Sequence, residues 1–149
     1  MPFPPQYYYH LKMKHLSITL IMLCICAALS AQAYELPQQA KDFLGKHFPD
    51  NEILTIQHKR DYDVVLNNFT KIEFTRKGEL IEINSKMADK GIPDSLIPGK
   101  VRKLINDKWP EAKKVSLEYN VRDNSYELQL DNNVTIQFFH DGTLIDISF

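Results

Sequence analysis

The chain carries one pattern twice, about sixty residues apart. Each copy has a proline, then an aromatic residue followed by proline, and then a stretch of alternating apolar and polar residues that contains a glycine. In the first copy these are Pro37, Phe48-Pro49 and 71–83; in the second they are Pro98, Trp109-Pro110 and 135–147. The proline and the aromatic-proline pair recur 61 residues later, whereas the later stretch recurs 64 residues later. The second copy is therefore three residues longer, and these residues fall in the turn at 120–124. Because a repeated pattern folds into repeated local structure, two similar halves are predicted.

Each copy is predicted to begin with a helix. Apolar residues recur at helical spacing before a proline ends the run: Leu36, Ala40, Phe43, Leu44 and Phe48 in the first copy, Ile97, Val101, Leu104, Ile105 and Trp109 in the second. Four stretches follow in each copy in which apolar and polar residues alternate, as in a half-buried antiparallel sheet. The predicted fold class is α+β: a tandem repeat of a helix plus a four-stranded antiparallel sheet, with the helices on one face and the other face open.

The turns set the expected strand register. Lys77-Gly78 and Asp141-Gly142 are interpreted as two-residue hairpin loops, in which glycine supplies the positive φ. Three-residue loops are expected at 67–69 and 131–133. With these lengths Phe74 faces Ile81 and Phe138 faces Ile145, on the face that the helices cover.

The first 33 residues are interpreted as a targeting segment. Lys12 and Lys14 precede the short apolar run 16–29, and Ala31-Gln32-Ala33 resembles a cleavage site. The run is too short to span a membrane as a helix, and Met13 is the more natural start, which makes 1–12 an upstream extension. The predicted organisation is a signal peptide at 1–33, a first α-β4 repeat at 34–84, a connector at 85–94 and a second α-β4 repeat at 95–149.

Composition excludes several kinds of site. Both cysteines, Cys24 and Cys26, lie in the targeting segment, so no disulfide, thiolate metal site or cysteine nucleophile is expected after cleavage. Lipid anchoring is not expected either, because Leu23 and Ile25 stand where a small residue is required. Of the 18 basic residues two lie in this segment, which leaves 16 against 19 acidic ones and a formal charge of −3. Such a surface does not favour nucleic acid as a partner.

Acidic residues fall in rows on the face predicted to be open. Asp63, Glu73 and Glu82 are expected side by side in the first half. In the second half the same places hold Glu127, Gln137 and Asp146, with Glu118 beside Glu127. Like charges opposite one another destabilise a sheet. Three interpretations remain open: a calcium site, with Asp63, Glu73 and Glu82 as candidate ligands; a surface for a basic partner segment; or solvated carboxylates that keep the protein soluble.

Apolar residues are also expected on the open face. Phe139 and Leu144 are predicted to face each other across the Asp141-Gly142 hairpin, and Val65 and Leu80 add apolar surface in the first half. An aromatic residue within a polar rim is typical of a protein-binding surface. Alternatively, Phe139 covers a contact between the two halves.

No pattern in the chain indicates catalysis. His47, His58 and His140 do not form a cluster or a triad in the predicted register, and no serine lies in a nucleophile-elbow motif. No glycine-rich phosphate loop occurs. An open sheet face supplies no pocket in which two carboxylates could acquire different pKa values, so the protein is not expected to be an enzyme and no cofactor is expected, calcium apart.

With these marks the chain resembles the β-lactamase-inhibitor-like, PepSY-like exported proteins of Bacteroides-type bacteria. The resemblance rests on Phe48-Pro49 and Trp109-Pro110 and on the hairpins Phe74-x-x-x-Gly78 and Phe138-x-x-x-Gly142. It implies helices on one sheet face, an open concave face that grips a protein, and no catalytic motif.

The expected function is a periplasmic or secreted, non-enzymatic module that binds a protein or peptide. The expected partner-binding face is made of seven residues: Asp63, Glu73, Glu82, Glu127, Phe139, Leu144 and Asp146. The alternative is a calcium-responsive periplasmic protein that uses the acidic rows. Continuity of the two sheets and the oligomeric state stay open.

Overall fold

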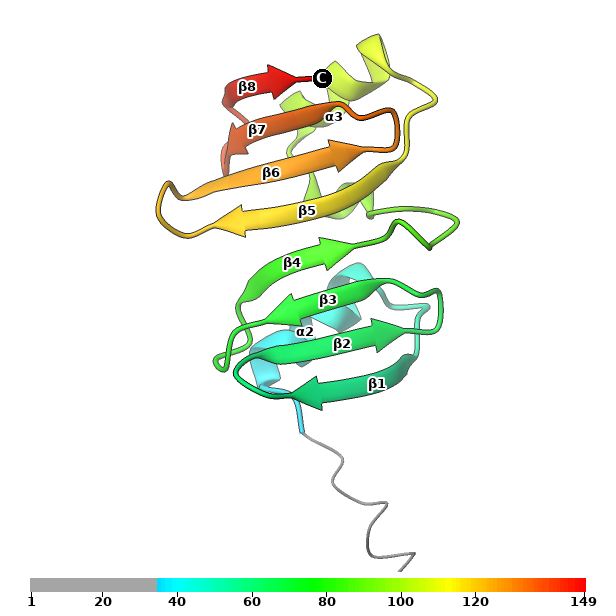
Figure 1. Ribbon diagram of the computed structural model, residues 1–149, viewed down its shortest axis with the longest axis vertical. Coiled ribbons are helices and arrows are strands. Elements are labelled where there is room, and N and C mark those ends of the chain that lie inside the picture. The colour runs from blue at the N-terminus through cyan, green and yellow to red at the C-terminus, as the bar shows by residue number, and fades with distance from the viewer. Residues whose placement is uncertain (1–34) are drawn as a thin grey trace, which may run out of the picture. The chain divides into compact units, whose positions relative to one another are not determined.

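The computed structural model describes residues 35–149, so the predicted signal peptide and upstream extension lie outside the described residues. The described elements are the helices α2 (Gln38–His47) and α3 (Gly99–Lys108), the short 3-10 helix η1 (Asp94–Leu96), and eight strands: β1 (Ile53–His58), β2 (Tyr62–Leu66), β3 (Lys71–Phe74), β4 (Leu80–Asn84), β5 (Lys114–Asn120), β6 (Ser125–Leu130), β7 (Thr135–Phe139) and β8 (Leu144–Ser148). Figure 1 shows both helices on the same side of the strands.

All eight strands form one antiparallel sheet in the order of the sequence, β1 to β8 (Figure 1). The predicted α+β class and antiparallel pairing are therefore confirmed. The two groups of four strands are continuous, because β4 pairs with β5 through Glu82 with Glu118, Ile83 with Leu117 and Asn84 with Ser116. Residues 34–149 accordingly form one compact unit.

The helices begin and end at the predicted prolines and aromatic residues. Pro37 and Pro98 occupy the N-cap positions, and Phe48 and Trp109 the C-cap positions. Each helix turns two small or aliphatic residues toward the sheet: Ala40 and Leu44 from α2, Val101 and Ile105 from α3. The lysines of both helices lie on the solvent side, as an amphipathic surface helix requires.

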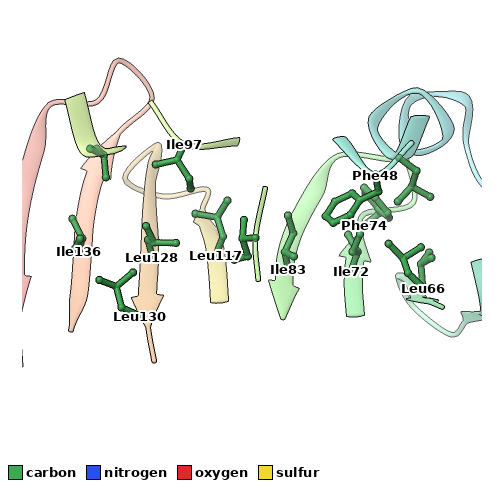
Figure 2. Packing of buried hydrophobic residues seen from close by; sticks show 14 of the residues in the cluster. Phe48, Leu66, Ile72, Phe74, Ile83, Ile97, Leu117, Leu128, Leu130 and Ile136 are labelled. Carbon is green, nitrogen blue, oxygen red and sulfur yellow. The ribbon is translucent and has the colours of Figure 1, made fainter. Parts of the chain in front are cut away.

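The hydrophobic core runs without a break under both helices. Figure 2 shows the side chains of buried strand residues pointing to the same side of the sheet: Leu66, Ile72, Phe74, Ile83, Leu117, Leu128 and Ile136. Ile83 and Leu117, which meet where β4 pairs with β5, are 0% and 1% exposed. Ile92 and Ile97, from the segment between the halves, are buried over this junction. The join between the halves is therefore core and not a surface contact.

The glycine hairpins differ from the prediction in both halves. Thr75 N–H donates to the Glu79 carbonyl over 2.8 Å and Phe139 N–H to the Thr143 carbonyl over 2.9 Å, so each loop has three residues and not two. Gly78 and Gly142 have φ values of 89° and 80°, and a turn followed by a left-handed glycine makes such a loop. The three-residue loops predicted at 67–69 and 131–133 are confirmed by the bonds Leu66 to Thr70 and Leu130 to Val134.

An extra residue in β4 and in β8 changes the pairing next to these loops only, and the pairs further from the loops, such as Glu73 with Glu82 and Gln137 with Asp146, are those expected. Phe74 pairs with Leu80 and not with Ile81, and Phe138 pairs with Leu144 and not with Ile145; the register shifts lie between Glu73 and Phe74 and between Gln137 and Phe138. Such a bulge opposes two residues to one. The predicted opposition of Phe139 and Leu144 is therefore wrong: Leu144 lies on the helix-covered side. Leu80 likewise packs against the core and not on the open face.

Candidate binding surface

One row of polar residues crosses the whole open face of the sheet. Each strand contributes one residue and each is in register with the next; this acidic row is Gln57, Asp63, Glu73, Glu82, Glu118, Glu127, Gln137 and Asp146. Neighbouring strands lie about 4.8 Å apart. Five carboxylates, from Asp63 to Glu127, therefore follow one another across the face; Gln57 precedes them, and Gln137 separates them from the sixth, Asp146.

The sequence predicted two short rows, and the structure joins them. Asp63, Glu73 and Glu82 stand side by side as expected, as do Glu127, Gln137 and Asp146. The link between them is the pair Glu82 and Glu118. This link depends on the pairing of β4 with β5, which are separated by a connector and a helix, so no local turn could have indicated it.

The row has little internal compensation. Gln137 Nε2 donates to Glu127 Oε2 over 3.0 Å, but no ion pair within residues 35–149 includes a carboxylate of the acidic row. Burial raises the pKa of Glu73 above its usual 4.5, and the negative charges of Asp63, Asp61 and Glu82 raise this pKa further. Ionised carboxylates in the row thus repel one another, and this repulsion lowers the stability of the folded protein.

Replacing Glu73 with glutamine should stabilise the protein at pH 7. The substitution removes two cross-strand like-charge contacts, and each is worth about 0.2–1 kcal/mol, so we expect a gain of about 0.5–1 kcal/mol. Because the folded pKa of Glu73 is raised, the wild type loses stability as pH rises through the range above 4.5. The gain should therefore disappear below that pH, where Glu73 is protonated in both states.

Urea unfolding at pH 7 and at low pH measures this difference. Glu111→Gln, at an exposed position outside the strands, is the control and should change the free energy of unfolding by less than about 0.5 kcal/mol. A destabilised Glu73→Gln at pH 7 would contradict the charge repulsion.

The open face is hollowed over both halves. A hollow of about 360 Å³ lies over β1 to β4, and its lining includes Gln57, Asp63, Glu73 and Glu82 of the acidic row together with Lys71. A smaller hollow of about 130 Å³ is lined by Glu118, Asn120, Asp123, Ser125, Tyr126, Glu127 and Gln137. Each residue of the acidic row except Asp146 thus lines one of two shallow hollows on the open face.

Phe139 is the large apolar residue at one side of this surface. It pairs with Ser125 and is 42% exposed, and because the adjacent Phe138 is buried, Phe139 points to the open face. Val65 lies on the same face, half-buried between Thr55 and Lys71. Of the four apolar residues predicted here, the structure keeps Phe139 and Val65 and moves Leu80 and Leu144 to the helix side.

The histidines lie apart from one another. His47 Nδ1 is 2.9 Å from Ser95 Oγ, and burial lowers the His47 pKa. His58 stacks on Tyr62 with ring centroids 4.2 Å apart, and His140 lies 6.1 Å from the Tyr126 ring. Within residues 35–149 no three histidine, cysteine or acidic side chains are arranged to hold a metal ion.

Three solved structures are similar to the chain over most of its length. A "putative calcium-regulated periplasmic protein" from Bacteroides thetaiotaomicron is 28% identical, with a TM-score of 0.66 over 79% of this chain and 94% of that one. Two putative periplasmic proteins from Bacteroides vulgatus are 32% and 29% identical, with TM-scores of 0.64 and 0.65. The first of these matches over 76% of this chain and 91% of its own, the second over 80% and 97%. No curated protein matches the chain.

These relatives also bear on location. All three are described as periplasmic, which confirms the prediction of a periplasmic or secreted protein. In the described residues, neither helix has the length and apolar character needed to cross a membrane.

The model of one protein family matches residues 60–146, from the loop before β2 into β8. It therefore includes both glycine hairpins and the second aromatic-proline pair on which the resemblance rested. That family is described as "Putative beta-lactamase-inhibitor-like, PepSY-like", and the chain belongs to it.

Proposed function

We propose that the protein is a non-enzymatic periplasmic module that holds a protein or peptide against the open face of its sheet. The observation that carries the proposal is the acidic row, which has six carboxylates on the open face and no ion-pair partner within the described residues. A row of like charges lowers stability, and a partner with basic groups would remove that cost on binding.

The proposed binding face is the open face alone. It contains Asp63, Glu73, Glu82, Glu118, Glu127 and Asp146 as the charged groups, with Phe139 as an apolar anchor at the side. Aromatic anchors inside a polar rim carry much of the binding free energy in protein interfaces. Leu144, which was expected here, is left out because it pairs with Phe138 on the other side.

The absence of catalysis is part of the proposal. The hollows over the acidic row are shallow, and the three histidines lie in separate surroundings. A carboxylate pair acts as acid and base only when its environment separates the two pKa values. The family description and the descriptions of the relatives name no reaction.

We also propose that the two halves are a tandem repeat in the strict sense. Support comes from the repeated order of a helix and four strands, and from the same bulge in β4 and β8. The two glycines also make the same contact: a Cβ on Gly78 would lie 3.0 Å from Pro37 Cβ, before α2, and one on Gly142 would lie 2.8 Å from Pro98 Cβ, before α3.

Co-purification from periplasmic extract tests the binding proposal. The wild type should retain a partner that Phe139→Ala and the double reversal Glu82→Lys/Glu118→Lys both lose. The double reversal Glu52→Lys/Glu111→Lys changes the same number of charges at exposed positions outside the strands and should retain the partner. Retention of the same proteins by all four samples, or of none by the wild type, would overturn the proposal.

The alternative function is that of a calcium-responsive protein. It is favoured by the description of one relative as a "putative calcium-regulated periplasmic protein" and by the oxygen ligands that the acidic row offers. Its candidate ligands are Asp63, Glu73 and Glu82, whose side chains, as they lie in the described residues, are not grouped to hold a metal ion and would have to turn toward one another on binding.

A thermal melt with calcium and with chelator tests this alternative. A ligand of the folded state at 100 times its dissociation constant adds about 2.7 kcal/mol, so a clear rise in Tm is expected if calcium binds, and Glu82→Gln should reduce it. Equal melts in calcium and chelator would remove the alternative and leave the protein-binding proposal intact.

A further inference from the structure

Two strands of the sheet form its edges. In the part of the chain that the structure describes, β1 and β8 are the ends of the strand order. Neither contains lysine or proline, and the only charge on β8 is Asp146. Lysine and proline are common means of preventing an edge from pairing. Both edges are therefore chemically able to accept another strand.

The chain itself contains a template for how these edges can pair. By the repeat, β8 corresponds to β4 and β1 corresponds to β5. Within the chain β4 pairs with β5 through Glu82 with Glu118, Ile83 with Leu117 and Asn84 with Ser116. The corresponding pairs between β8 and a β1 would be Asp146 with Gln57, Ile147 with Ile56 and Ser148 with Thr55.

The bulges in the edge strands do not oppose this pairing. The register shift of β1 lies between Ile53 and Thr55, and β5 has the corresponding shift between Lys114 and Ser116. Even so, β5 pairs with β4 on its other side. The bulge of β8 lies before Asp146, as that of β4 lies before Glu82. The strand segments that would pair are thus those that already pair inside the chain.

The side chains that would meet are compatible, and more so than in the template. Asp146 would lie opposite Gln57, an acceptor opposite an amide donor, where the internal junction places two glutamates. Ile147 and Ile56 are half-buried now and pack against the core cluster of their own halves. One position further along the strands, Phe149 would lie opposite Leu54; their side chains are 89% and 54% exposed. The corresponding residues at the internal junction, Ser85 and Val115, share a backbone hydrogen bond of 2.7 Å.

We propose that β8 of one copy pairs with β1 of a second copy in the register of the internal β4–β5 junction. The occupant of each edge is thus a second copy of this chain, bound head to tail. Such a contact joins two different surfaces and can repeat, giving open chains or a ring and not stopping at a dimer. The acidic row would continue from one copy to the next. The inference does not depend on the proposed binding function.

Cross-linking of single-cysteine variants tests the register. In an antiparallel pair of strands, hydrogen-bonded and non-hydrogen-bonded residue pairs alternate. Ser85 and Val115 share a backbone hydrogen bond, so the next pair, Asn84 and Ser116, is a non-hydrogen-bonded pair. The Cα atoms of such a pair lie about 4.5 Å apart. That distance suits a disulfide. Ser148→Cys and Thr55→Cys, at the corresponding positions, should form a disulfide-linked heterodimer when the two proteins are mixed and oxidised, whereas either protein oxidised alone should give no disulfide-linked dimer.

The experiment uses protein purified from the periplasm of cells expressing the full chain with Cys24→Ala and Cys26→Ala, so that the introduced thiol is the only one. Ser148→Cys mixed with Gln57→Cys is the control, because a diagonal pair lies about 7–8 Å apart and should cross-link far less. Homodimers of either protein alone would show symmetrical pairing and overturn the proposal. Equal yields from the matched and the diagonal mixtures, or no cross-link, would also overturn it.

Sedimentation of the cysteine-free protein provides a second readout. Its average mass should rise with concentration past that of a dimer. Gln57→Glu should reduce the association, because two carboxylates would then oppose each other, and adding Asp146→Asn should restore it. An average mass that stays monomeric at every concentration, or a Gln57→Glu variant that associates like the parent protein, would contradict the head-to-tail contact.

Discussion

Phe74→Ala should lower the free energy of unfolding by about 3–5 kcal/mol, the range found for buried phenylalanine. Phe74 is fully buried, and its ring meets that of Phe43 of α2 edge-on, with centroids 5.5 Å apart. Alanine would leave a cavity between β3 and α2 that the paired strands cannot close. Domains of this size have only about 5–15 kcal/mol of stability in total, so the loss is a large part of the whole.

The same substitution in the second half should have a similar effect. Phe138 is 1% exposed and stacks on Tyr126. Because β4 and β5 are paired and the core is continuous, we expect either variant to unfold in one transition monitored by both fluorescence and circular dichroism. Phe69→Ala, 62% exposed in a loop, is the control and should stay within about 0.5 kcal/mol of the wild type. Two separate transitions in Phe74→Ala would show that the halves fold independently.

Much of this fold could be predicted from the sequence because its signals are local. Helices bounded by Pro37 and Phe48 and by Pro98 and Trp109, and strands with period-two alternation, need only neighbouring residues. The loops at 67–69 and 131–133 have the expected length. The repeat supports each element, because the same pattern occurs twice with different residues.

The pairing next to the glycine hairpins could not be predicted in the same way. Gly78 and Gly142 fit a two-residue loop and a three-residue loop equally well by residue type, since both need a positive φ. The choice between them, and the bulges at Ile81 and Ile145 that follow, determined whether Leu80 and Leu144 face the helices. Leucine suits either face of an outer or half-buried strand, so composition gave no correction.

The acidic row was found from the sequence in two pieces for a related reason. Alternation within a strand and short turns between strands place Asp63, Glu73 and Glu82 together, and Glu127, Gln137 and Asp146 together. The pair Glu82 and Glu118 depends on a pairing across the connector, which is held by Ser85 bonding Val115 and Ile92 bonding Lys114. A contact of that range leaves no periodic signal.

Gly78→Ala should destabilise the protein by about 2–4 kcal/mol, although it adds a single methyl group. The residue has a φ of 89°, and a side chain in left-handed backbone costs about 1–2 kcal/mol. The added Cβ would also lie 2.8 Å from Ala40 N, a backbone atom in the first turn of α2, and forcing packed elements apart costs about 1–3 kcal/mol.

Gly45→Ala is the matched control, because it makes the same chemical change in the same helix-and-hairpin unit. An added Cβ at Gly45 would meet nothing within 4 Å, and the residue lies within α2. Alanine should therefore stabilise the protein there by about 0.4–1 kcal/mol, through the smaller entropy of the unfolded chain. Thermal and urea unfolding of the two variants should thus shift in opposite directions. In both halves the glycine hairpin contacts the start of the helix. If Gly78→Ala left the free energy of unfolding unchanged, this contact would not be what fixes the helix on the sheet.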